Sequence, residues 1–231
     1  FKSEHARVYL NGKYLGLYLR IENILEYFLE ANNLDPEGNL YKATVDRACL
    51  GVYDIPDSVW EKKTNADEGI TDLLDLIDRI NTVPDKDYFA FANEHLDYEK
   101  MVNMVSLHIL FAHGSTYYHN YFMYHDIHGT GKWMMFPWDM DKTFGQNYTY
   151  HYPYQRSSPS FYPDNPFHER AVLNETILND IRARINEFSE TIFDKDYLYG
   201  IIDSLHTVLE SSVREDITDA INDIGTWNAE L

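Results

Sequence analysis

Near the amino end, hydrophobic and polar positions alternate as they do in β-strands. The dipeptide Asn11-Gly12 separates two apolar-rich runs, residues 6–10 and 13–20. This dipeptide favours the type I′ turn of a two-residue hairpin. Leu15, Leu17 and Leu19 occupy alternate positions, which predicts one buried face on the second strand.

Farther along, the spacing of apolar residues predicts helices and short strands. Predicted helices cover residues 22–31, 70–80, 97–111 and 175–209, and predicted strands cover residues 39–44, 121–124 and 133–136. The helix over 97–111 is apolar nearly all round, which is typical of a helix packed on several sides. The strands at 121–124 and 133–136 flank a polar, Gly-containing turn and predict a second hairpin.

These elements indicate an α+β fold in a single domain over residues 1–231. We expect a sheet-rich part over residues 1–68 and a mainly helical part over 69–231 that contains the hairpin 119–138. The connection between the first hairpin and the strand at 39–44 is short for a parallel crossover, so an antiparallel or mixed sheet is favoured. Residues 45–68 are polar and are expected to be irregular.

Composition and net charge argue against several classes of binding partner for this chain, in particular nucleic acids and membranes. The chain carries 19 Lys and Arg against 38 Asp and Glu, a formal net charge of −19 at pH 7. This charge repels phosphate backbones and anionic lipids, so a nucleic-acid or membrane-surface partner is not expected. No apolar run approaches the roughly 20 residues of a membrane span. The sequence Phe1-Lys2-Ser3 is not a natural start, so we expect that a leader was removed from a longer chain.

The mouth of the second hairpin is a candidate metal site. If the turn centres near Gly129, Asn120 at the entrance lies across from Trp138 and Asp139 at the exit, and Asp141 follows two residues later. An amide oxygen with carboxylates suits a hard cation such as Mg²⁺ or Ca²⁺. The alternative interpretation is that Asn120 and Asp139 only cap the strand ends.

Lys42 is a second candidate, because it lies on a predicted strand that follows a helix. A strand lysine paired with a helix-borne carboxylate holds nucleotide phosphates in protein-kinase-like folds. The alternative is a solvated lysine at a sheet edge. The sequence has no Rossmann or P-loop glycine motif, so any nucleotide site belongs to another class.

Several motifs in order resemble those of the CotH proteins, the spore-coat kinase-like family. Residues 6–18, Glu22 and residues 38–42 resemble the amino-terminal signature, residues 119–124, 130–133 and 137–145 resemble the second signature, and residues 165–167 resemble its usual continuation. The similarity extends from about residue 6 to about residue 215, which is nearly the whole chain.

This resemblance implies an atypical protein-kinase-like fold that binds ATP with a divalent cation, Mg²⁺, Mn²⁺ or Ca²⁺. Lys42 resembles the phosphate-binding lysine of the family, and Glu22 is the candidate partner of Lys42. Asn120 and Asp139 resemble the metal ligands, and Asp141 is a third candidate. The resemblance also implies a protein partner or substrate in a spore coat or cell-surface assembly outside the cell.

One departure from the family pattern concerns the catalytic base. Active members carry an Asp a few residues before the His-Asn pair, whereas residues 112–120 contain no carboxylate here. His113 or His119 could replace it, although a histidine beside a buried helix more often has a structural role. Two functions therefore stay open: an atypical Ser/Thr kinase, and a non-catalytic structural or adhesive module on the same fold.

The net charge adds a condition to nucleotide binding. ATP is a polyanion, so a chain with a charge of −19 is expected to hold it only through Lys42 and divalent ions on Asn120, Asp139 and Asp141. We therefore expect strict metal dependence.

Overall fold

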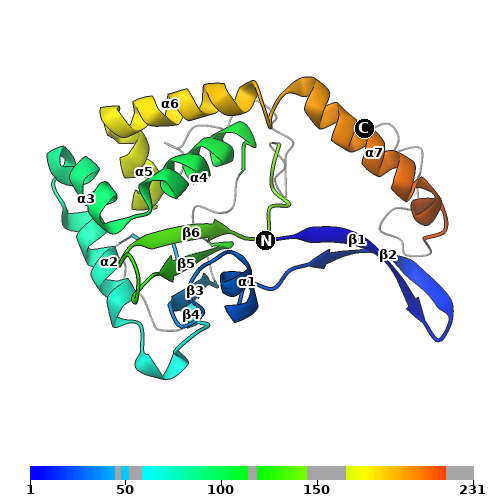
Figure 1. Ribbon diagram of the computed structural model, residues 1–231, viewed down its shortest axis with the longest axis horizontal. Helices are drawn as coiled ribbons and strands as arrows, with labels where there is room; N and C mark the ends of the chain where they lie inside the picture. Colours follow the sequence, from blue (N-terminus) through cyan, green and yellow to red (C-terminus); the bar gives the residue numbers. More distant parts are fainter. Residues whose placement is uncertain (45–47, 52–58, 114–118, 145–164, 217–231) are drawn as a thin grey trace. The chain divides into compact units, whose positions relative to one another are not determined.

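The computed structural model describes residues 1–44, 48–51, 59–113, 119–144 and 165–216 (Figure 1). Two compact units divide the chain: the first joins Phe1–Ile24 with Phe188–Leu231, and the second is Leu25–Glu187. Helices and strands are both present, so the α+β class is confirmed. The single domain over 1–231 stays a prediction.

The first unit contains the predicted amino-terminal hairpin. Strand β1 (Ser3–Leu10) pairs antiparallel with β2 (Lys13–Ile21). Asn11 and Gly12 have φ angles of 50° and 78°, the left-handed conformations that a type I′ turn requires. The hairpin and its turn are therefore confirmed.

The predicted buried face of β2 is wrong. Leu15 and Leu17 are only half-buried, and Leu19 is 52% exposed. The end of helix α7 (Lys195–Arg214) contacts β2, where the Tyr14 hydroxyl donates to the Ser212 carbonyl over 3.0 Å. The Leu17 amide donates to Asp216 over 2.8 Å, so this contact fixes the strand without covering all of its leucines.

Gly16 lies against Asp216, just beyond the end of α7, and we expect Gly16→Ala to be destabilising. A Cβ at this position would lie 2.7 Å from Oδ1 of Asp216, and the φ of Gly16 is +148°. We expect a loss of about 1–2 kcal/mol in the free energy of unfolding, measured by urea denaturation. Gly200→Ala is the control, because its Cβ would meet open space in α7 and Ala favours a helix. Equal stabilities for the two variants would contradict the expectation.

The second unit is built on an antiparallel four-stranded sheet in the order β4-β3-β5-β6. The strands are β3 (Asn39–Ala43), β4 (Trp60–Lys62), β5 (Tyr121–His125) and β6 (Trp133–Pro137). The strand near 39–44 and the hairpin of β5 and β6 are as predicted. Strand β4 corrects the expectation of an irregular 45–68 region: it is only three residues long, and its Trp60 is buried.

The helices of this part follow the apolar pattern with some corrections. They are α1 (Glu26–Ala31), α2 (Thr71–Thr82), α3 (Tyr88–His95), α4 (Tyr98–Leu110), α5 (Pro166–Leu173) and α6 (Glu175–Ser189). The predicted helix over 22–31 begins only at Glu26, because the Glu22 amide donates to the Lys2 carbonyl over 2.8 Å and continues the hairpin ladder. The short helices α3 and α5 were not predicted.

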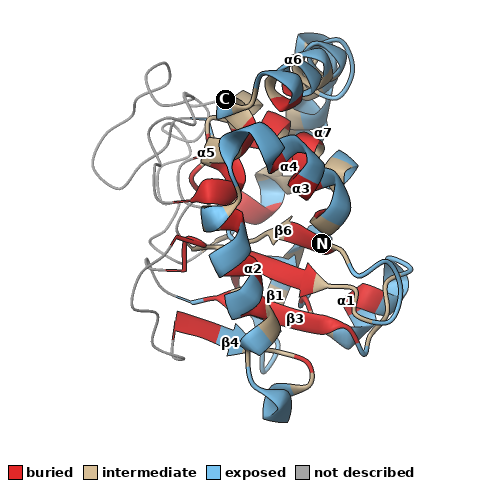
Figure 2. Ribbon diagram, turned by 90° about the vertical axis from the view of Figure 1, so that its left-hand side faces the viewer, coloured by how far each residue is buried: buried red, intermediate tan, exposed pale blue. Residues whose placement is uncertain are grey.

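Different helices pack against the two faces of the sheet. On one face, Tyr41, Met123 and Met135 join the main hydrophobic core with residues of α2 and α4. On the other face, Phe28 of α1 contacts Phe136 with 5.3 Å between ring centroids. Figure 2 shows the buried residues along β3 and β6. The sheet is therefore buried on both faces.

Helix α4 is the central helix of the core, as its all-round apolar sequence predicts. Its buried residues are Met101, Val102, Met104, Val105, Ser106 and His108. Asp97 caps its first turn, and the Asp97 amide donates to the Trp133 carbonyl over 2.8 Å. This bond ties the start of α4 to the start of β6. None of the helices in the described ranges has both the length and the apolarity to cross a membrane.

Candidate functional site

The mouth of the second hairpin has the predicted backbone arrangement. The Trp138 amide donates to the Asn120 carbonyl over 2.9 Å, one step beyond the pair of Tyr121 and Pro137. Asn120 therefore lies across from Trp138, and Asp139 follows directly. The two strands thus bring the residues that carry an amide and a carboxylate to the same end of the hairpin.

Asn120 and Asp139 both have a left-handed backbone, with φ angles of 61° and 54°. This conformation is uncommon outside glycine, although Asn and Asp tolerate it best. Asn120 is half-buried, and Asp139 is exposed. Their side chains thus leave the regular alternation of the strands, and such conformations persist only where the surrounding structure holds them.

The segment after β6 is anchored to the end of α4. The Phe144 amide donates to the Phe111 carbonyl over 2.5 Å, and the rings of Phe111 and Phe144 pack edge to face. His113 donates from Nδ1 to the Lys142 carbonyl over 3.1 Å. Asp141 lies within this anchored segment and is exposed.

His113 has a structural role, because its buried ring binds the backbone of the segment after β6. It is 1% exposed, and burial lowers the pKa of its imidazole to about 4, despite the opposing effect of the Lys142 carbonyl. A neutral ring that donates to a backbone carbonyl holds the segment that carries Asp141. His119 is half-buried directly before Asn120. Residues 114–118 of the stretch that lacks a carboxylate lie outside the described residues.

Lys42 lies on the α1-covered face of the sheet. It pairs in register with Phe122 of β5 and with Glu61 of β4. Its Nζ is 5.6 Å from the ring centroid of Trp138 and 6.0 Å from that of Phe122. An ammonium over an aromatic face is attracted by the ring quadrupole. Trp138 directly precedes Asp139, so the sheet brings Lys42 to the hairpin mouth.

Trp138 was missed as a site residue by sequence reasoning. The signal was present, because Phe122, Phe136 and Trp138 occupy alternate positions that share one face of the β5–β6 pair. Phe122 and Trp138 contact each other edge to face at 5.7 Å. The alternation alone could have placed Trp138 on this face, but its contact with Lys42 requires the pairing of β3 with β5.

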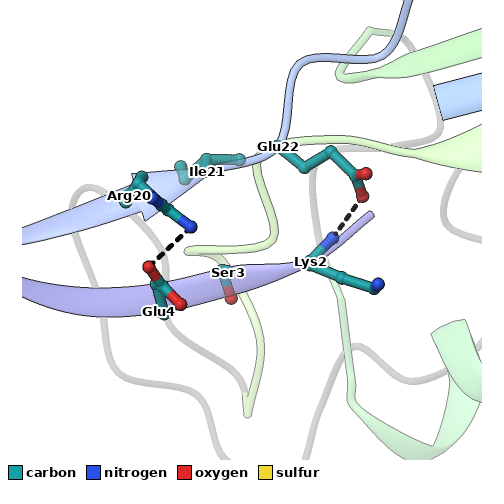
Figure 3. Close-up of a pocket in the computed structure, with 6 residues that line it drawn as sticks. All are labelled: Lys2, Ser3, Glu4, Arg20, Ile21 and Glu22. Carbon is teal, nitrogen blue, oxygen red and sulfur yellow. Dashed lines mark hydrogen bonds and ion pairs between the residues drawn. The ribbon is translucent and has the colours of Figure 1, made fainter. Parts of the chain in front are cut away.

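Glu22 lies at the end of β2 in the first unit, whereas Lys42 belongs to the second unit. The Glu22 carboxylate accepts a hydrogen bond of 2.8 Å from the Lys2 amide. It also lines a pocket of about 310 Å³ with Lys2, Ser3, Glu4, Arg20 and Ile21 (Figure 3). The pairing of Glu22 with Lys42 stays a prediction.

A second polar cluster lies at the other end of β5 and was not predicted. Asp72, in the first turn of α2, accepts hydrogen bonds from Asn39 over 2.9 Å, from His125 over 2.8 Å and from the Tyr41 hydroxyl. Burial opposes ionisation of Asp72, but these donors outweigh it and hold the pKa of the carboxyl below its ordinary value. The His125 ring stacks on Trp133 at 4.2 Å. This cluster joins α2 to β3 and β5.

Two buried histidines connect α4 to α5. Nδ1 of His108 lies 2.9 Å from Nε2 of His168, so one ring donates to the other. The His113 ring centroid is 5.3 Å from that of His108. Burial lowers the pKa of His168 to about 3 and lowers that of His108 strongly. All three rings are therefore neutral near pH 7.

The donor set of the hairpin mouth suits a hard cation. Within the described ranges, no group of three His, Cys, Asp or Glu side chains could hold a metal ion by itself. Asn120, Asp139 and Asp141 offer one amide and two carboxylates, and Mg²⁺ or Ca²⁺ takes such oxygens together with water or phosphate oxygens. Metal binding by these three residues stays a prediction.

Comparisons with known proteins agree with these motifs. The chain matches the family model described as CotH kinase protein over residues 1–231. It is similar to the inner spore coat protein H of Bacillus subtilis (strain 168), with 31% identity over 154 residues. The aligned part is 63% of this chain and 42% of that relative, so the chain spans less than half of the relative's length. The match over the whole sequence shows that the chain belongs to the CotH family.

Proposed function

We propose that this chain binds ATP together with a divalent cation at the hairpin mouth. The observation that carries the proposal is the convergence of Lys42 and Asp139 around Trp138: Nζ of Lys42 lies 5.6 Å from the Trp138 ring, and Asp139 is the next residue. In kinase-like folds, a lysine ammonium group together with a carboxylate that binds a divalent metal ion neutralises the phosphates of the nucleotide. The family description, a CotH kinase protein, supports the same function.

In this proposal each residue has a separate role. Asn120, Asp139 and Asp141 hold Mg²⁺, Mn²⁺ or Ca²⁺ through oxygen atoms, and Lys42 binds the phosphates as a point charge. The left-handed backbone of Asn120 and Asp139 re-aims their side chains, and the bonds from Phe144 and His113 to the end of α4 hold the following segment in place. We propose an atypical kinase-like fold on the basis of this arrangement and the family.

Phosphoryl transfer by this chain would require a catalytic base. Phosphoryl transfer to a Ser or Thr hydroxyl of a partner protein needs a group that orients the hydroxyl and accepts its proton. Residues 112–120 supply no carboxylate, and His113 is committed to the Lys142 carbonyl. This observation favours a second candidate function, a non-catalytic structural or adhesive module that retains nucleotide or metal binding.

We also propose that the protein acts outside the cell, in a spore coat or cell-surface assembly. The relative from Bacillus subtilis is named as an inner spore coat protein, and the family supports a coat role. Its partner would be another protein of such an assembly. The net charge of −19 supports a protein partner over nucleic acid.

Asp139→Ala is expected to abolish metal-dependent stabilisation by ATP. In the unchanged chain, ATP with Mg²⁺, Mn²⁺ or Ca²⁺ at about 100 times the dissociation constant should raise the free energy of unfolding by about 2.7 kcal/mol. This is a shift of about 5–10 °C in thermal unfolding. ATP without metal should give no shift, because the protein is strongly acidic.

The matched control is Asp75→Ala, which removes an exposed carboxylate of α2 in the same unit. Asp75→Ala should retain the full shift, whereas Lys42→Met should reduce it. Transfer of labelled phosphate to the chain or to added protein, lost in Asp139→Ala, would support the kinase. Binding without transfer would support the non-catalytic module. Absence of any shift at millimolar ATP with each metal would refute the proposed site.

A further inference from the structure

Lys42 is a half-buried lysine whose charge is not neutralised by a carboxylate of the described residues. Its cross-strand partner on β4 is Glu61, but the Glu61 carboxylate pairs with Nζ of Lys63 over 2.6 Å. In the part of the chain that the structure describes, the Lys42 side chain forms no ion pair and no hydrogen bond. Its ammonium group is therefore held by another kind of contact.

Two aromatic rings stand where an acidic partner would be expected. Nζ of Lys42 lies over the Trp138 ring, 5.6 Å from its centroid, and 6.0 Å from the centroid of Phe122. Both distances are within the roughly 6 Å over which the negative face of an aromatic ring attracts a cation. Tryptophan attracts cations best among the aromatic residues, so Trp138 is the main partner of Lys42.

The Trp138 ring is itself fixed in place. The Trp138 amide donates to the Asn120 carbonyl over 2.9 Å, which holds its backbone at the hairpin mouth. Its ring packs edge to face on Phe122, with 5.7 Å between centroids and 82° between ring planes. Phe122 is 2% exposed and belongs to β5. A ring held by its backbone and by a buried neighbour offers the ammonium group a defined location.

An aromatic partner has two consequences for Lys42 that a carboxylate partner would not have. The ring carries no net charge, so it neither neutralises the ammonium group nor repels a phosphate. In a chain with a net charge of −19, this leaves a full positive charge for a polyanion at the site. The contact also orders a long side chain in advance, so less conformational entropy remains to be lost on binding.

We propose that Trp138 is a positioning residue for Lys42: its ring holds the ammonium group beside Asp139, in place for the phosphates of a nucleotide. This inference rests on the proposed ATP site and adds a residue that acts there only through Lys42. Two other arrangements lead to different results. In one, Trp138 stacks on the base of the nucleotide, and in the other, the Glu22 carboxylate holds Lys42.

NMR spectra of the lysine side chains in the ligand-free chain test the ring contact without a nucleotide. Protons beside the face of a tryptophan ring resonate upfield. The Lys42 CεH₂ signals, assigned by their loss in Lys42→Met, should therefore lie upfield of those of Lys86, whose side chain is 83% exposed. Trp138→Leu should move the Lys42 signals toward those of Lys86, whereas Glu22→Gln should leave them in place. The reverse result, or Lys42 signals that coincide with those of Lys86 in the unchanged chain, would overturn the proposal.

Affinities for ATP and for inorganic triphosphate, each with Mg²⁺, test the effect on phosphate binding. Trp138→Leu should weaken both by about threefold to tenfold, which corresponds to the cost of ordering one long side chain. A loss confined to ATP would overturn the proposal in favour of stacking on the base. Trp138→Tyr keeps an aromatic face and should retain most of the affinity. Tyr27→Leu, at an 86% exposed residue of α1, is the control and should bind as the unchanged chain does.

A double-mutant cycle separates positioning from a general structural effect. In the Lys42→Met background, Trp138→Leu should no longer weaken binding, because the lysine through which the ring acts is absent. The same loss in both backgrounds would overturn the proposal.

The two kinds of measurement also separate this inference from the ATP site on which it rests. Absence of ATP and triphosphate binding by the unchanged chain would refute the ATP site, whereas the NMR signals would still decide whether Trp138 holds Lys42. If Trp138→Leu does not fold, the Lys42 signals of the unchanged chain and the affinities of Trp138→Tyr decide.

Discussion

Asp72→Ala is expected to lower the free energy of unfolding by about 3 kcal/mol. The Asp72 carboxylate accepts from Asn39, Tyr41 and His125, and the Tyr41 ring is fully buried in the core. Removing a shared acceptor leaves buried donors unsatisfied, at a cost of about 1–3 kcal/mol for each fully buried group. The three donors lie on β3 and β5, so the substitution also removes the hydrogen bonds that tie the first turn of α2 to the sheet.

Urea denaturation at pH 7 measures this loss, and Asp75→Ala is its control. Asp75 lies on the same helix, is exposed, and pairs with Arg79 over 3.8 Å, so its removal should cost no more than about 0.5 kcal/mol. Asp72→Asn keeps the shape and one acceptor oxygen and should fall between the two. A loss below about 1 kcal/mol for Asp72→Ala would mean that water replaces the carboxylate.

Local patterns were sufficient to predict several elements. The Asn11-Gly12 turn, the β5–β6 hairpin and helix α4 follow from turn chemistry and apolar spacing, and the structure has them close to the predicted positions. The opposition of Asn120 and Trp138 also follows from hairpin pairing alone. Local pairing is predictable because the turn sets the register.

Features that depend on long-range contacts could not be predicted in the same way. Strand β4 has three residues and is defined by its pairing with β3, which no short pattern indicates. The contact of Lys42 with Trp138 depends on the pairing of β3 with β5. The predicted buried face of β2 was wrong because an alternating pattern identifies a face but not what covers it. A contact between residues on strands that are distant in the sequence therefore cannot be predicted from local patterns alone.

Acidification from pH 8 to pH 5 is expected to lower the free energy of unfolding by at least about 4 kcal/mol through the buried histidines. In the folded state burial lowers the pKa of His113 to about 4 and of His168 to about 3, and the pKa of His108 is also strongly lowered. The unfolded chain takes up these protons near pH 6.5. Stability is therefore complete above pH 6.5 and falls as the pH drops toward 4, because only the unfolded state is protonated in that window.

His113 and His168 each contribute about 2 kcal/mol between pH 8 and pH 5, and their sum is a large part of the stability of a typical domain. Urea denaturation at steps of half a pH unit measures how steeply the free energy of unfolding falls with pH.

The variant His168→Gln has no imidazole to take up a proton at this position. Its free energy of unfolding should therefore fall less steeply with acid, although the value at pH 8 is lower because the bond to His108 changes. His5→Gln, at an exposed position, should leave the slope unchanged. A slope in His168→Gln as steep as in the unchanged chain would show that His168 is protonated equally in both states. The fall expected here begins well above the ordinary pKa of carboxyl groups, so it separates the histidines from Asp72, whose stabilising effect is lost only at lower pH.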